Sequence, residues 1–448
     1  MRVITYGTFD LFHEGHRRLL ERARALGDYL VVGVTTDSYD DSRGKLNVTQ
    51  PLMDRVRNIM ESGLADEVII EEYEGQKVHD IQKYKIDIFA IGSDWVGKFD
   101  HLNDYCKVVY LERTKGISST QLRNEQGVLR IGIVGAGRIA ARFVEEARFV
   151  SGVNVEAVHS RRHASAAAFA ERLELGAAYA DYADMLANVD AVYVASPHEA
   201  HAGHVRTALE AGRHVLCEKP MALSSAEVRE LFELASSRGL VLLEAVKTAF
   251  APGFQRMIAV ARSGHIGQIR AVEATFTKLV DSGRELQGPY GGSISELATY
   301  PFLAIVKLLG TEFSDLECLT WRSPEGVDLF ARTTVFCEEA IGTAVTGLGV
   351  KSDGSLVVAG TRGYVHVPAP WWLTELFEVH FEDSRLDNRY FYKFEGDGLR
   401  YELSEFVSLI RTGTLESYKL RPEESIAIAA MLERARASSR EIGAGRHE

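Results

Sequence analysis

Two segments of this chain each join a short apolar strand to a glycine-containing loop that opens a helix. The first runs through Val3–Asp10 into His13–His16, and the second runs through Leu129–Val134 into Gly135–Ala140. Loops of this kind hold phosphate groups at the N-terminus of the helix that follows. Because a strand and loop that restart near residue 128 are hard to fit inside one fold, the sequence predicts two enzymes joined head to tail.

The composition narrows the class of protein. The length of 448 residues leaves room for about three domains. Acidic residues outnumber basic ones by 63 to 51, and the net charge of −12 disfavours nonspecific nucleic-acid binding. The four cysteines are scattered without a CxxC pair, so we expect neither a disulfide framework nor a zinc site. The N-terminus enters a strand directly and no apolar run reaches the ~18 residues of a membrane span, so we expect a cytoplasmic chain.

The order of apolar runs predicts three domains. Residues 1–127 alternate short strands with helices, which indicates a parallel sheet covered on both faces. The same alternation returns over residues 128–247. From residue 248 to residue 448, β-rich runs such as Ile269–Lys278 and Leu329–Phe336 predict a mostly antiparallel open sheet, followed by C-terminal helices. The predicted fold class is α/β, with two Rossmann-like domains and then an α+β domain.

The histidine pair near the N-terminus is the first candidate site. His13 and His16 stand three residues apart where a helix begins, so both imidazoles can lie on one face. Gly15 lets a phosphate approach the backbone, and the helix N-terminus adds unpaired N–H groups. Such a cradle suits nucleotidyl transfer, which needs alignment and charge stabilisation more than a covalent nucleophile. Histidine pairs of this spacing are in general more often surface or cap residues, but the preceding strand and loop favour a phosphate site.

A second polar cluster, Arg113–Thr120, follows a strand and opens a helix. It offers an arginine, hydroxyls and N–H groups to phosphate, and a plain Ser/Thr helix cap explains it equally well. With the motifs ITYGTFD, HxGH, GSDWVGKFD and RTKGISST, residues 1–125 resemble the glycerol-3-phosphate cytidylyltransferase family over their whole length.

The resemblance implies an HxGH nucleotidyltransferase domain that takes CTP with Mg²⁺ on its triphosphate and an alditol phosphate as acceptor. It assigns His13 and His16 to stabilising the transition state. The residues that would bind CTP are Thr8, Phe9, Asp94, Arg113, Thr114, Ser118, Ser119 and Thr120. Those that would contact the acceptor phosphate are Asp10, Lys45 and Arg55.

The second candidate site is a dinucleotide fingerprint that follows the strand Arg130–Val134 and opens a helix. Its candidate pyrophosphate contacts are Gly135, Gly137, Arg138, Ile139 and Ala140. The next strand ends in Ser160, Arg161 and Arg162, without the acid that binds the ribose of NAD. Serine and arginine suit a 2′-phosphate, so NADP is favoured over NAD, with solvated arginines as the alternative.

Two more motifs, Ser196–His201 and Glu218–Pro220, directly follow apolar runs. α/β sheets place their ligands at such strand ends. The cofactor contacts they suggest are Ser196, Pro197 and His201 in the first and Glu218 and Lys219 in the second. A cis Lys219–Pro220 bond would aim the lysine rigidly, and a lysine beside a nicotinamide can protonate a carbonyl being reduced. Glu296 and Tyr300 stand four apart, on one predicted helical face, with Tyr300 as a second proton donor. The alternatives without a catalytic role are a surface turn for Lys219–Pro220 and a core position for Tyr300.

Residues 129–440 resemble the glucose-fructose oxidoreductase/inositol dehydrogenase (Gfo/Idh/MocA) family, on the motifs GIVGAGRIA, SPHEAH, EKP and GGSISELATYP. The resemblance makes Lys219 the central catalytic residue. It places Glu296 and Tyr300 where the family usually has Asp and His. Because the family's β-rich half commonly pairs face to face, it also implies a homo-oligomer.

Together the two halves predict a bifunctional enzyme. The C-terminal half would reduce a ketose or aldose phosphate with NADPH, and the N-terminal half would couple the resulting alditol phosphate to CTP, making a precursor of wall or capsule polymers. In one alternative, the oxidoreductase acts on the CDP-linked product. In another, the C-terminal half is a cofactor-binding scaffold or sensor with little catalysis.

Overall fold

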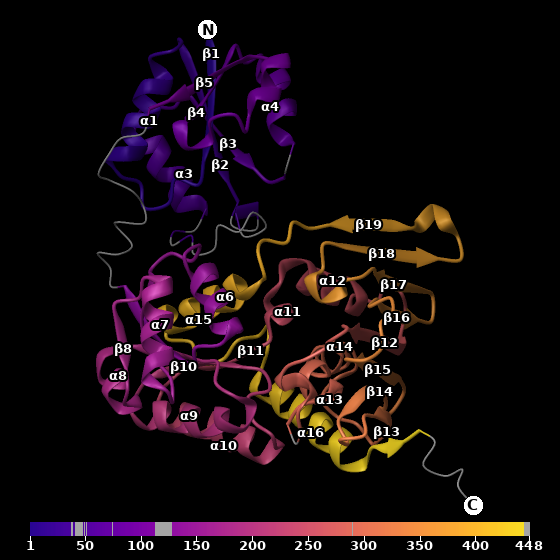
Figure 1. The fold of residues 1–448 in the computed structure, drawn as a ribbon. Coiled ribbons are helices and arrows are strands. Elements are labelled where there is room, and N and C mark those ends of the chain that lie inside the picture. The colour runs from indigo at the N-terminus through magenta and orange to yellow at the C-terminus, as the bar shows by residue number, and fades with distance from the viewer. Residues whose placement is uncertain are drawn as a thin grey trace, which may run out of the picture. The chain divides into compact units, whose positions relative to one another are not determined.

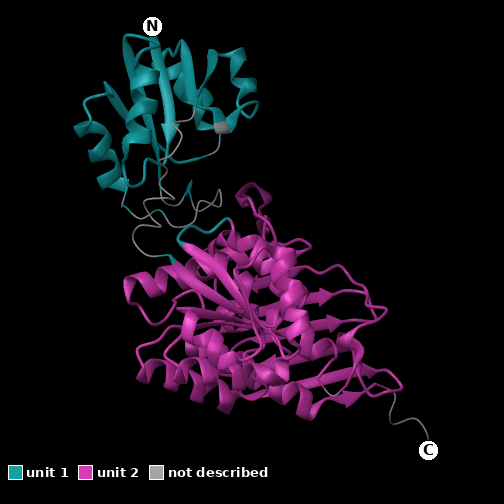
Figure 2. Ribbon diagram, turned by 60° about the vertical axis from the view of Figure 1, so that its left-hand side comes forward, with its two compact units in different colours: residues 1–128, 149–152 teal, residues 129–148, 153–448 magenta. Residues whose placement is uncertain are grey.

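The computed structural model describes residues 1–36, 39–40, 48, 50, 52–73, 75–112, 128–288 and 290–442. The chain forms two units (Figure 2). Unit 1 comprises residues 1–128 with 149–152, and unit 2 comprises residues 129–148 with 153–448. No helix within the described ranges is both long enough and apolar enough to cross a bilayer.

Unit 1 is built on a five-stranded parallel sheet with the strand order β3-β2-β1-β4-β5 (Figure 1). The strands are β1 (Arg2–Gly7), β2 (Tyr29–Thr35), β3 (Glu67–Glu71), β4 (Ile88–Gly92) and β5 (Lys107–Leu111). The helices are α1 (Glu14–Arg24), α3 (Leu52–Glu61) and α4 (Gln76–Tyr84), with 3₁₀ turns η1 (Ser93–Trp95) and η2 (Asp100–Asp104). Since all strands run the same way, the loops that follow β1 and β2 meet at one edge of the sheet.

Two apolar layers hold this sheet, because successive side chains of a strand point to opposite faces. Val3 of β1 packs with Leu20 of α1 and Ile59 of α3 in one layer. Its neighbour Ile4 packs with Ile81 of α4 in the other. The alternation therefore fixes which helices cover which face and places the N-terminus of α1 beside the end of β1.

Unit 2 opens with a six-stranded parallel sheet in the order β11-β10-β9-β6-β7-β8. Its strands are β6 (Leu129–Val134), β7 (Val153–His159), β8 (Ala177–Tyr179), β9 (Ala191–Val194), β10 (His214–Glu218) and β11 (Leu242–Ala245). The intervening helices are α6 (Arg138–Ala147), α7 (His163–Leu173), α8 (Tyr182–Asn188), α9 (His198–Glu210) and α10 (Ser225–Ser237). The strand order reverses direction between β6 and β9, which is where such sheets bind dinucleotides.

The rest of unit 2 carries a nine-stranded mixed sheet in the order β19-β18-β17-β16-β12-β15-β14-β13-β20. The strands are β12 (Ile269–Thr277), β13 (Asp315–Arg322), β14 (Asp328–Phe336), β15 (Ile341–Gly347), β16 (Leu356–Gly360), β17 (Gly363–Val367), β18 (Leu376–Phe381), β19 (Asn388–Phe391) and β20 (Arg440–Glu441). The pairs β12/β15 and β13/β20 are parallel and the other pairs are antiparallel. This mixed, mostly antiparallel sheet confirms the predicted α+β domain.

Helices cover one face of the nine-stranded sheet. They are α12 (Pro252–Arg262), α13 (Ser293–Leu297), α14 (Thr299–Leu309) and α16 (Pro422–Ser438). The opposite face carries exposed apolar side chains, among them Leu319, Trp321, Ile341 and Tyr364. Two more helices, α11 (Lys247–Phe250) and α15 (Leu399–Thr412), pack together, and α15 also contacts α6, β10 and β11 (Figure 1). A late segment of the chain thus returns to the dinucleotide-binding sheet.

Two expectations about local structure were wrong. The β-rich region holds more helix than predicted, because α14 is buried over almost its whole surface and so lacks an amphipathic pattern. Glu296 and Tyr300 do not share one helix: α13 ends at Leu297 and α14 begins at Thr299. Pro301 has no N–H to donate to the carbonyl of Leu297, which explains why the helix is interrupted between the two residues.

Candidate active sites

The N-terminal histidines lie at the start of α1. His13 is the N-cap residue, and its Nδ1 accepts a hydrogen bond from the backbone N–H of Gly15 at 3.0 Å. In a neutral imidazole the other nitrogen then carries the proton, so Nε2 of His13 is left as a hydrogen-bond donor. The sequence placed the histidine pair where a helix begins, and His13 is the cap of that helix.

The rings of His13 and His16 stack, with centroids 3.9 Å apart and planes inclined by 19°. Phe12 stacks on His16 from one side, and Phe9 meets it edge-on at 5.4 Å between centroids. The side chain of Phe9 is buried beneath this stack, so any contact between Phe9 and a nucleotide would come from its backbone. The structure thus brings the two histidines together above an aromatic floor.

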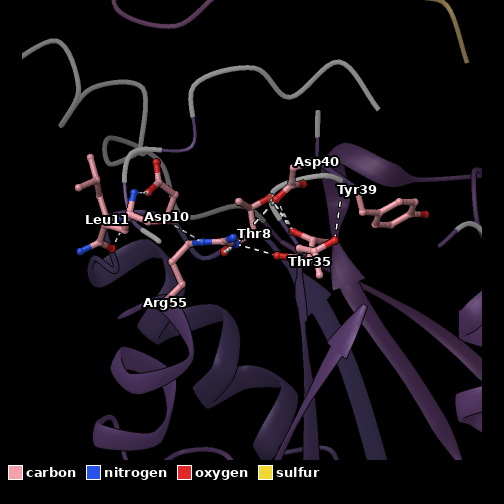
Figure 3. Close-up of polar contacts among 9 residues, drawn as sticks. Thr8, Asp10, Leu11, Thr35, Tyr39, Asp40 and Arg55 are labelled. Atoms are coloured by element: carbon pink, nitrogen blue, oxygen red, sulfur yellow. Dashed lines mark hydrogen bonds and ion pairs between the residues drawn. The ribbon is translucent and has the colours of Figure 1, made fainter. Parts of the chain in front are cut away.

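A polar network joins residues at the ends of β1 and β2 (Figure 3). The hydroxyl of Thr8 donates to Asp40 at 3.0 Å, and the hydroxyl of Thr35 also donates to that carboxylate. Arg55 donates to the carbonyl oxygens of Thr8 at 2.8 Å and Thr35 at 2.9 Å, and it lies 3.8 Å from Asp40. The carboxylate of Asp10 accepts the N–H of Gln50 at 2.9 Å. These bonds fix the loop that carries the histidines.

This geometry corrects the role expected of Arg55. Its side chain has 0% exposure, as has that of Asp40, and its guanidinium binds backbone carbonyls instead of facing solvent. Arg55 therefore holds the two strand ends together rather than contacting an acceptor phosphate. Thr8 and Asp10 also belong to this network, through the bonds to Asp40 and Gln50.

Replacing Arg55 with methionine is expected to loosen unit 1. The change leaves buried carbonyls and the carboxylate of Asp40 without their partner, a defect that typically costs about 3 kcal/mol or more. Native-state hydrogen exchange of β1 and β2 should accelerate about 100-fold. The control Arg57→Gln breaks an exposed pair with Asp54 and should leave exchange within about twofold. Unchanged exchange in Arg55→Met, with a raised KM for the acceptor, would restore the phosphate role.

Several expected CTP and acceptor contacts lie outside the described residues. These are Lys45, Arg113, Thr114, Ser118, Ser119 and Thr120. For Asp94, the structure places the backbone in η1 and leaves the side chain undescribed. Their roles remain predictions from the sequence.

The second site is a cavity of about 1170 Å³ in unit 2. It is lined by the expected cofactor residues Gly135, Gly137, Arg138, Ile139, Ser160, Arg161, Arg162, Ser196, Pro197 and His201, together with Glu218, Lys219, Glu296 and Tyr300. Ala140 does not line it, because its methyl group is buried where α6 packs on the sheet. All the other cofactor and catalytic residues predicted for this half therefore surround one space.

The glycine loop fits a pyrophosphate. Gly135 has a φ of +111°, and a Cβ there would lie 2.5 Å from the carbonyl oxygen of Ala195. A Cβ on Gly137 would meet only open space, and Gly137 caps α6 without any side-chain hydrogen bond. The first N–H groups of α6 thus face a space large enough for a ligand, the arrangement that binds anions. Neither Arg161 nor Arg162 forms an ion pair within the described part of the chain.

Lys219 lies where the cavity meets the mixed sheet. The Lys219–Pro220 bond is cis, as the sequence suggested. Its Nζ donates to the carbonyl oxygen of Glu296 at 2.8 Å and lies 5.6 Å from the ring centroid of Tyr300. Burial, with the nearby charges of Glu218 and other acids, raises the pKa of Tyr300 above its usual range, so the phenol keeps its proton at neutral pH. A lysine and a protonated phenol therefore face the same space.

Two histidines flank this lysine. His201 is buried, with Nδ1 2.8 Å from the carbonyl oxygen of Pro220 and Nε2 2.7 Å from that of Ser196. Burial lowers the pKa of His201 to about 4, so the ring is neutral at pH 7 and its single N–H donates to one of these two carbonyl oxygens. Burial and the charge of Lys219 lower the pKa of His198 to about 2, and His198 lies 3.9 Å from Glu296. His198 is neutral at pH 7 and sits within the site.

Among the cavity residues that sequence reasoning did not single out are His198, Lys247 and Glu402. The signal for Glu402 was present, because it lies on the helical stripe shared by Leu399 and Phe406, where a carboxylate is out of place. Lys247 directly follows the turn after β11, and its Nζ donates to the carbonyl oxygen of Asp397 at 2.6 Å. A charged residue on an otherwise apolar stripe could have been recognised in advance.

Comparisons with known proteins agree with this geometry. Residues 4–125 match the family described as cytidylyltransferase-like, and residues 129–246 match the oxidoreductase family with the NAD-binding Rossmann fold. Glycerol-3-phosphate cytidylyltransferase of Bacillus spizizenii is 51% identical over 129 residues, covering 29% of this chain and 98% of that protein.

The relatives of unit 2 are dehydrogenases. The scyllo-inositol 2-dehydrogenase (NADP(+)) IolU of Bacillus subtilis is 29% identical over 329 residues, which is 69% of this chain and 96% of IolU. Trans-1,2-dihydrobenzene-1,2-diol dehydrogenase of Macaca fuscata fuscata is 31% identical, with the same coverage. KijD10, a 3-ketoreductase from Actinomadura kijaniata solved with NADP and TDP-benzene, shares the fold with a TM-score of 0.62 and 23% identity, over 70% of this chain and 98% of KijD10.

The fold, the two sites and these relatives lead to one assignment. The chain belongs to the cytidylyltransferase-like family through residues 4–125 and to the NAD-binding Rossmann oxidoreductase family through residues 129–246, and it is an enzyme that joins a cytidylyltransferase to an NAD(P)-dependent oxidoreductase.

Proposed function

We propose that this enzyme makes a CDP-activated alditol from a sugar phosphate. Unit 2 reduces the carbonyl of a ketose or aldose phosphate with NADPH. Unit 1 then joins the alditol phosphate to the cytidylyl group of CTP and releases pyrophosphate. The observation that carries the proposal is the union, in one chain, of a domain 51% identical to a glycerol-3-phosphate cytidylyltransferase with a dinucleotide cavity that holds Lys219 and Tyr300. The product of one reaction is the acceptor of the other.

In unit 1 the acceptor phosphate oxygen attacks the α-phosphorus of CTP, and the bond to the leaving pyrophosphate breaks. The Nε2 donor of His13 and the imidazole of His16 stabilise the charge on the transition state. We assign Thr8, the backbone of Phe9, Asp94, Arg113, Thr114, Ser118, Ser119 and Thr120 to CTP, and Asp10 and Lys45 to the acceptor. In the described part of the chain no three His, Cys, Asp or Glu residues cluster as metal ligands, so we place Mg²⁺ on the triphosphate, where it neutralises phosphate charge.

In unit 2 the glycine loop and the N-terminus of α6 hold the pyrophosphate, and Ser160, Arg161 and Arg162 hold the 2′-phosphate of NADP. Bound there, the cofactor supplies a hydride. Lys219 and Tyr300 face the far end of the same cavity, where a carbonyl oxygen can accept a proton from either group as the alcohol forms. Glu296 holds the lysine through its backbone carbonyl.

The proposal extends to assembly and cellular role. The exposed apolar residues Leu319, Trp321, Ile341 and Tyr364 share the open face of the nine-stranded sheet, which suits pairing with a second copy of the chain. We therefore propose a homo-oligomer. CTP and NADPH are cytoplasmic metabolites, and a CDP-alditol made there would feed a cell-wall or capsule polymer.

A panel of keto and aldehyde phosphates with three to five carbons tests this function. Each is incubated with NADPH, CTP, Mg²⁺ and the wild-type chain, and products are followed by mass spectrometry. We expect one substrate to give NADPH oxidation, pyrophosphate and a CDP-alditol. The matching CDP-linked ketose is assayed in parallel. Reduction of the CDP-linked compound alone would reverse the order of the two steps, and absence of any CDP-alditol would refute the proposal.

The double variant Arg161→Ala/Arg162→Ala should weaken NADPH binding about 10- to 100-fold, because each charge-assisted hydrogen bond contributes about 1.5–3 kcal/mol. NADH binding should change little, since NADH lacks the 2′-phosphate. Fluorescence titration with each cofactor gives the ratio of the dissociation constants for NADPH and NADH. Arg172→Ala removes an exposed arginine of α7 outside the cavity and serves as the control. Equal weakening of NADPH and NADH would show that the arginines do not read the phosphate.

A further inference from the structure

Glu402 is a buried carboxyl group of unit 2 that the proposed mechanism does not use. It lies on α15, has 0% exposure, and neither carboxyl oxygen has a hydrogen-bond partner in the described structure. A buried ionised carboxylate without a partner is very costly, whereas the protonated acid is much cheaper to bury. Either the group holds a proton or something that binds nearby compensates its charge.

The charged neighbours of Glu402 are already engaged. On α6, Glu146 forms a two-bond ion pair with Arg400 at 2.7 and 2.9 Å. On α11, Lys247 donates to the carbonyl oxygen of Asp397. On β10, Glu218 accepts from the hydroxyl of Tyr193 at 2.6 Å. Other titratable or charged groups in this region are Arg142 on α6, which pairs with Asp397, and Glu244 on β11, which accepts from the N–H of Met221. Lys219 and the phenol of Tyr300 line the same cavity, and Glu402 acts on the pKa of Tyr300.

The electrostatic balance favours a neutral acid. Burial and the negative charges of Glu218 and Glu146 raise the pKa of Glu402 well above its usual range, while Lys247 opposes them. This environment therefore favours the protonated form of Glu402 over its carboxylate. A single additional positive charge nearby would reverse that balance, because charge interactions are strong in a buried site.

The cavity supplies a place for that charge. A dinucleotide bound here would have its pyrophosphate at the glycine loop after β6 and its 2′-phosphate at Ser160 and the two arginines after β7. A dinucleotide spans the crevice, so its nicotinamide end reaches the other half of the sheet, towards Lys219. Glu402 and Leu399 of α15 line the same cavity, and α15 contacts β10, which ends next to Lys219, and β11. The oxidised nicotinamide ring carries one positive charge that the reduced ring lacks.

We propose that Glu402 releases its proton when NADP⁺ binds and keeps it when NADPH binds, so that this end of the cavity has the same net charge in both redox states. The exchange is a simple ionisation: the protonated carboxyl becomes a carboxylate and one proton leaves. During reduction, the same ionisation can return a proton to the Lys219 or Tyr300 that protonated the product alcohol. The inference rests on the proposed function only in requiring a nicotinamide cofactor.

Calorimetric titration of the full chain with NADP⁺ and with NADPH tests the proposal without a sugar substrate. Heats measured at pH 7.5 in phosphate and in Tris, which have different ionisation enthalpies, give the number of protons exchanged. Groups that contact the parts shared by both cofactors contribute equally and cancel in the difference. We expect the wild type to release about one more proton with NADP⁺ than with NADPH, and its NADP⁺ affinity to rise up to about tenfold per pH unit.

Glu402→Gln should abolish this difference and the pH dependence, because glutamine mimics the protonated acid and cannot ionise. Glu402→Met serves as a second variant. The control Glu405→Gln removes a carboxylate from the same helix that pairs with Lys419, and it should behave as the wild type. Equal proton counts for the two cofactors in the wild type, or a difference that persists in Glu402→Gln, would overturn the inference alone. Failure of the wild type to bind either cofactor would overturn the proposed function with it.

Discussion

Replacing Lys219 with alanine is expected to lower kcat for NADPH-dependent reduction by about 10³-fold, the size of a lost general acid. The lysine projects from the cis Lys219–Pro220 turn into the cavity, beside Tyr300 and the carbonyl of Glu296. Without it, Tyr300 remains as a proton donor, so a residual rate should survive. The measurement is single-turnover NADPH oxidation with saturating substrate, together with pyrophosphate release from CTP and an alditol phosphate.

Lys219→Ala should lose reduction but keep cytidylyl transfer. Cytidylyl transfer in Lys219→Ala should stay within about twofold of the wild type, because the histidines belong to the other unit. NADPH should still bind, since the pyrophosphate and 2′-phosphate contacts are intact. Lys278→Met removes another lysine of the same cavity, one that pairs with Glu285, and should have a much smaller effect on kcat. Similar losses in the two lysine variants would contradict a special role for Lys219.

Replacing His16 with alanine is expected to lower cytidylyl transfer by about 10²- to 10³-fold, as when one transition-state donor is removed. His16 stacks on His13 at the N-terminus of α1, so its loss also frees the ring of His13. Formation of CDP-alditol from CTP measures the effect. NADPH oxidation by unit 2 should be unchanged.

His79→Ala is the matched control, because His79 is an exposed histidine on α4 of the same unit. It should retain full cytidylyl transfer. Loss of both activities in His16→Ala or in Lys219→Ala, with native circular dichroism, would show that the two sites do not work independently.

The sequence predicted both sites to the extent that local chemistry defines them. The loop after β6 needs a tight turn at Gly135 and open space for a ligand at Gly137, and glycine provides both. The pairing of His13 with His16 follows from helical spacing. These features depend on short stretches of chain, so pattern and spacing suffice to place them.

Features that depend on tertiary packing were not predictable in the same way. Arg55 has the charge of a phosphate ligand, yet the fold turns it inward to bond the ends of β1 and β2. Glu296 and Tyr300 lie near each other across a helix break, not along one helix. Glu402 reaches the cavity because α15 packs on β10 and β11, more than 150 positions later in the chain.

The central claim is that one chain holds two separate nucleotide sites. Calorimetric titration of the wild-type chain with CTP and Mg²⁺, and then with NADPH, tests it most directly. The account predicts one CTP and one NADPH bound per chain, with the heat of each unchanged by prior saturation with the other. Failure of well-folded protein to bind either nucleotide, or displacement of one by the other, would contradict it.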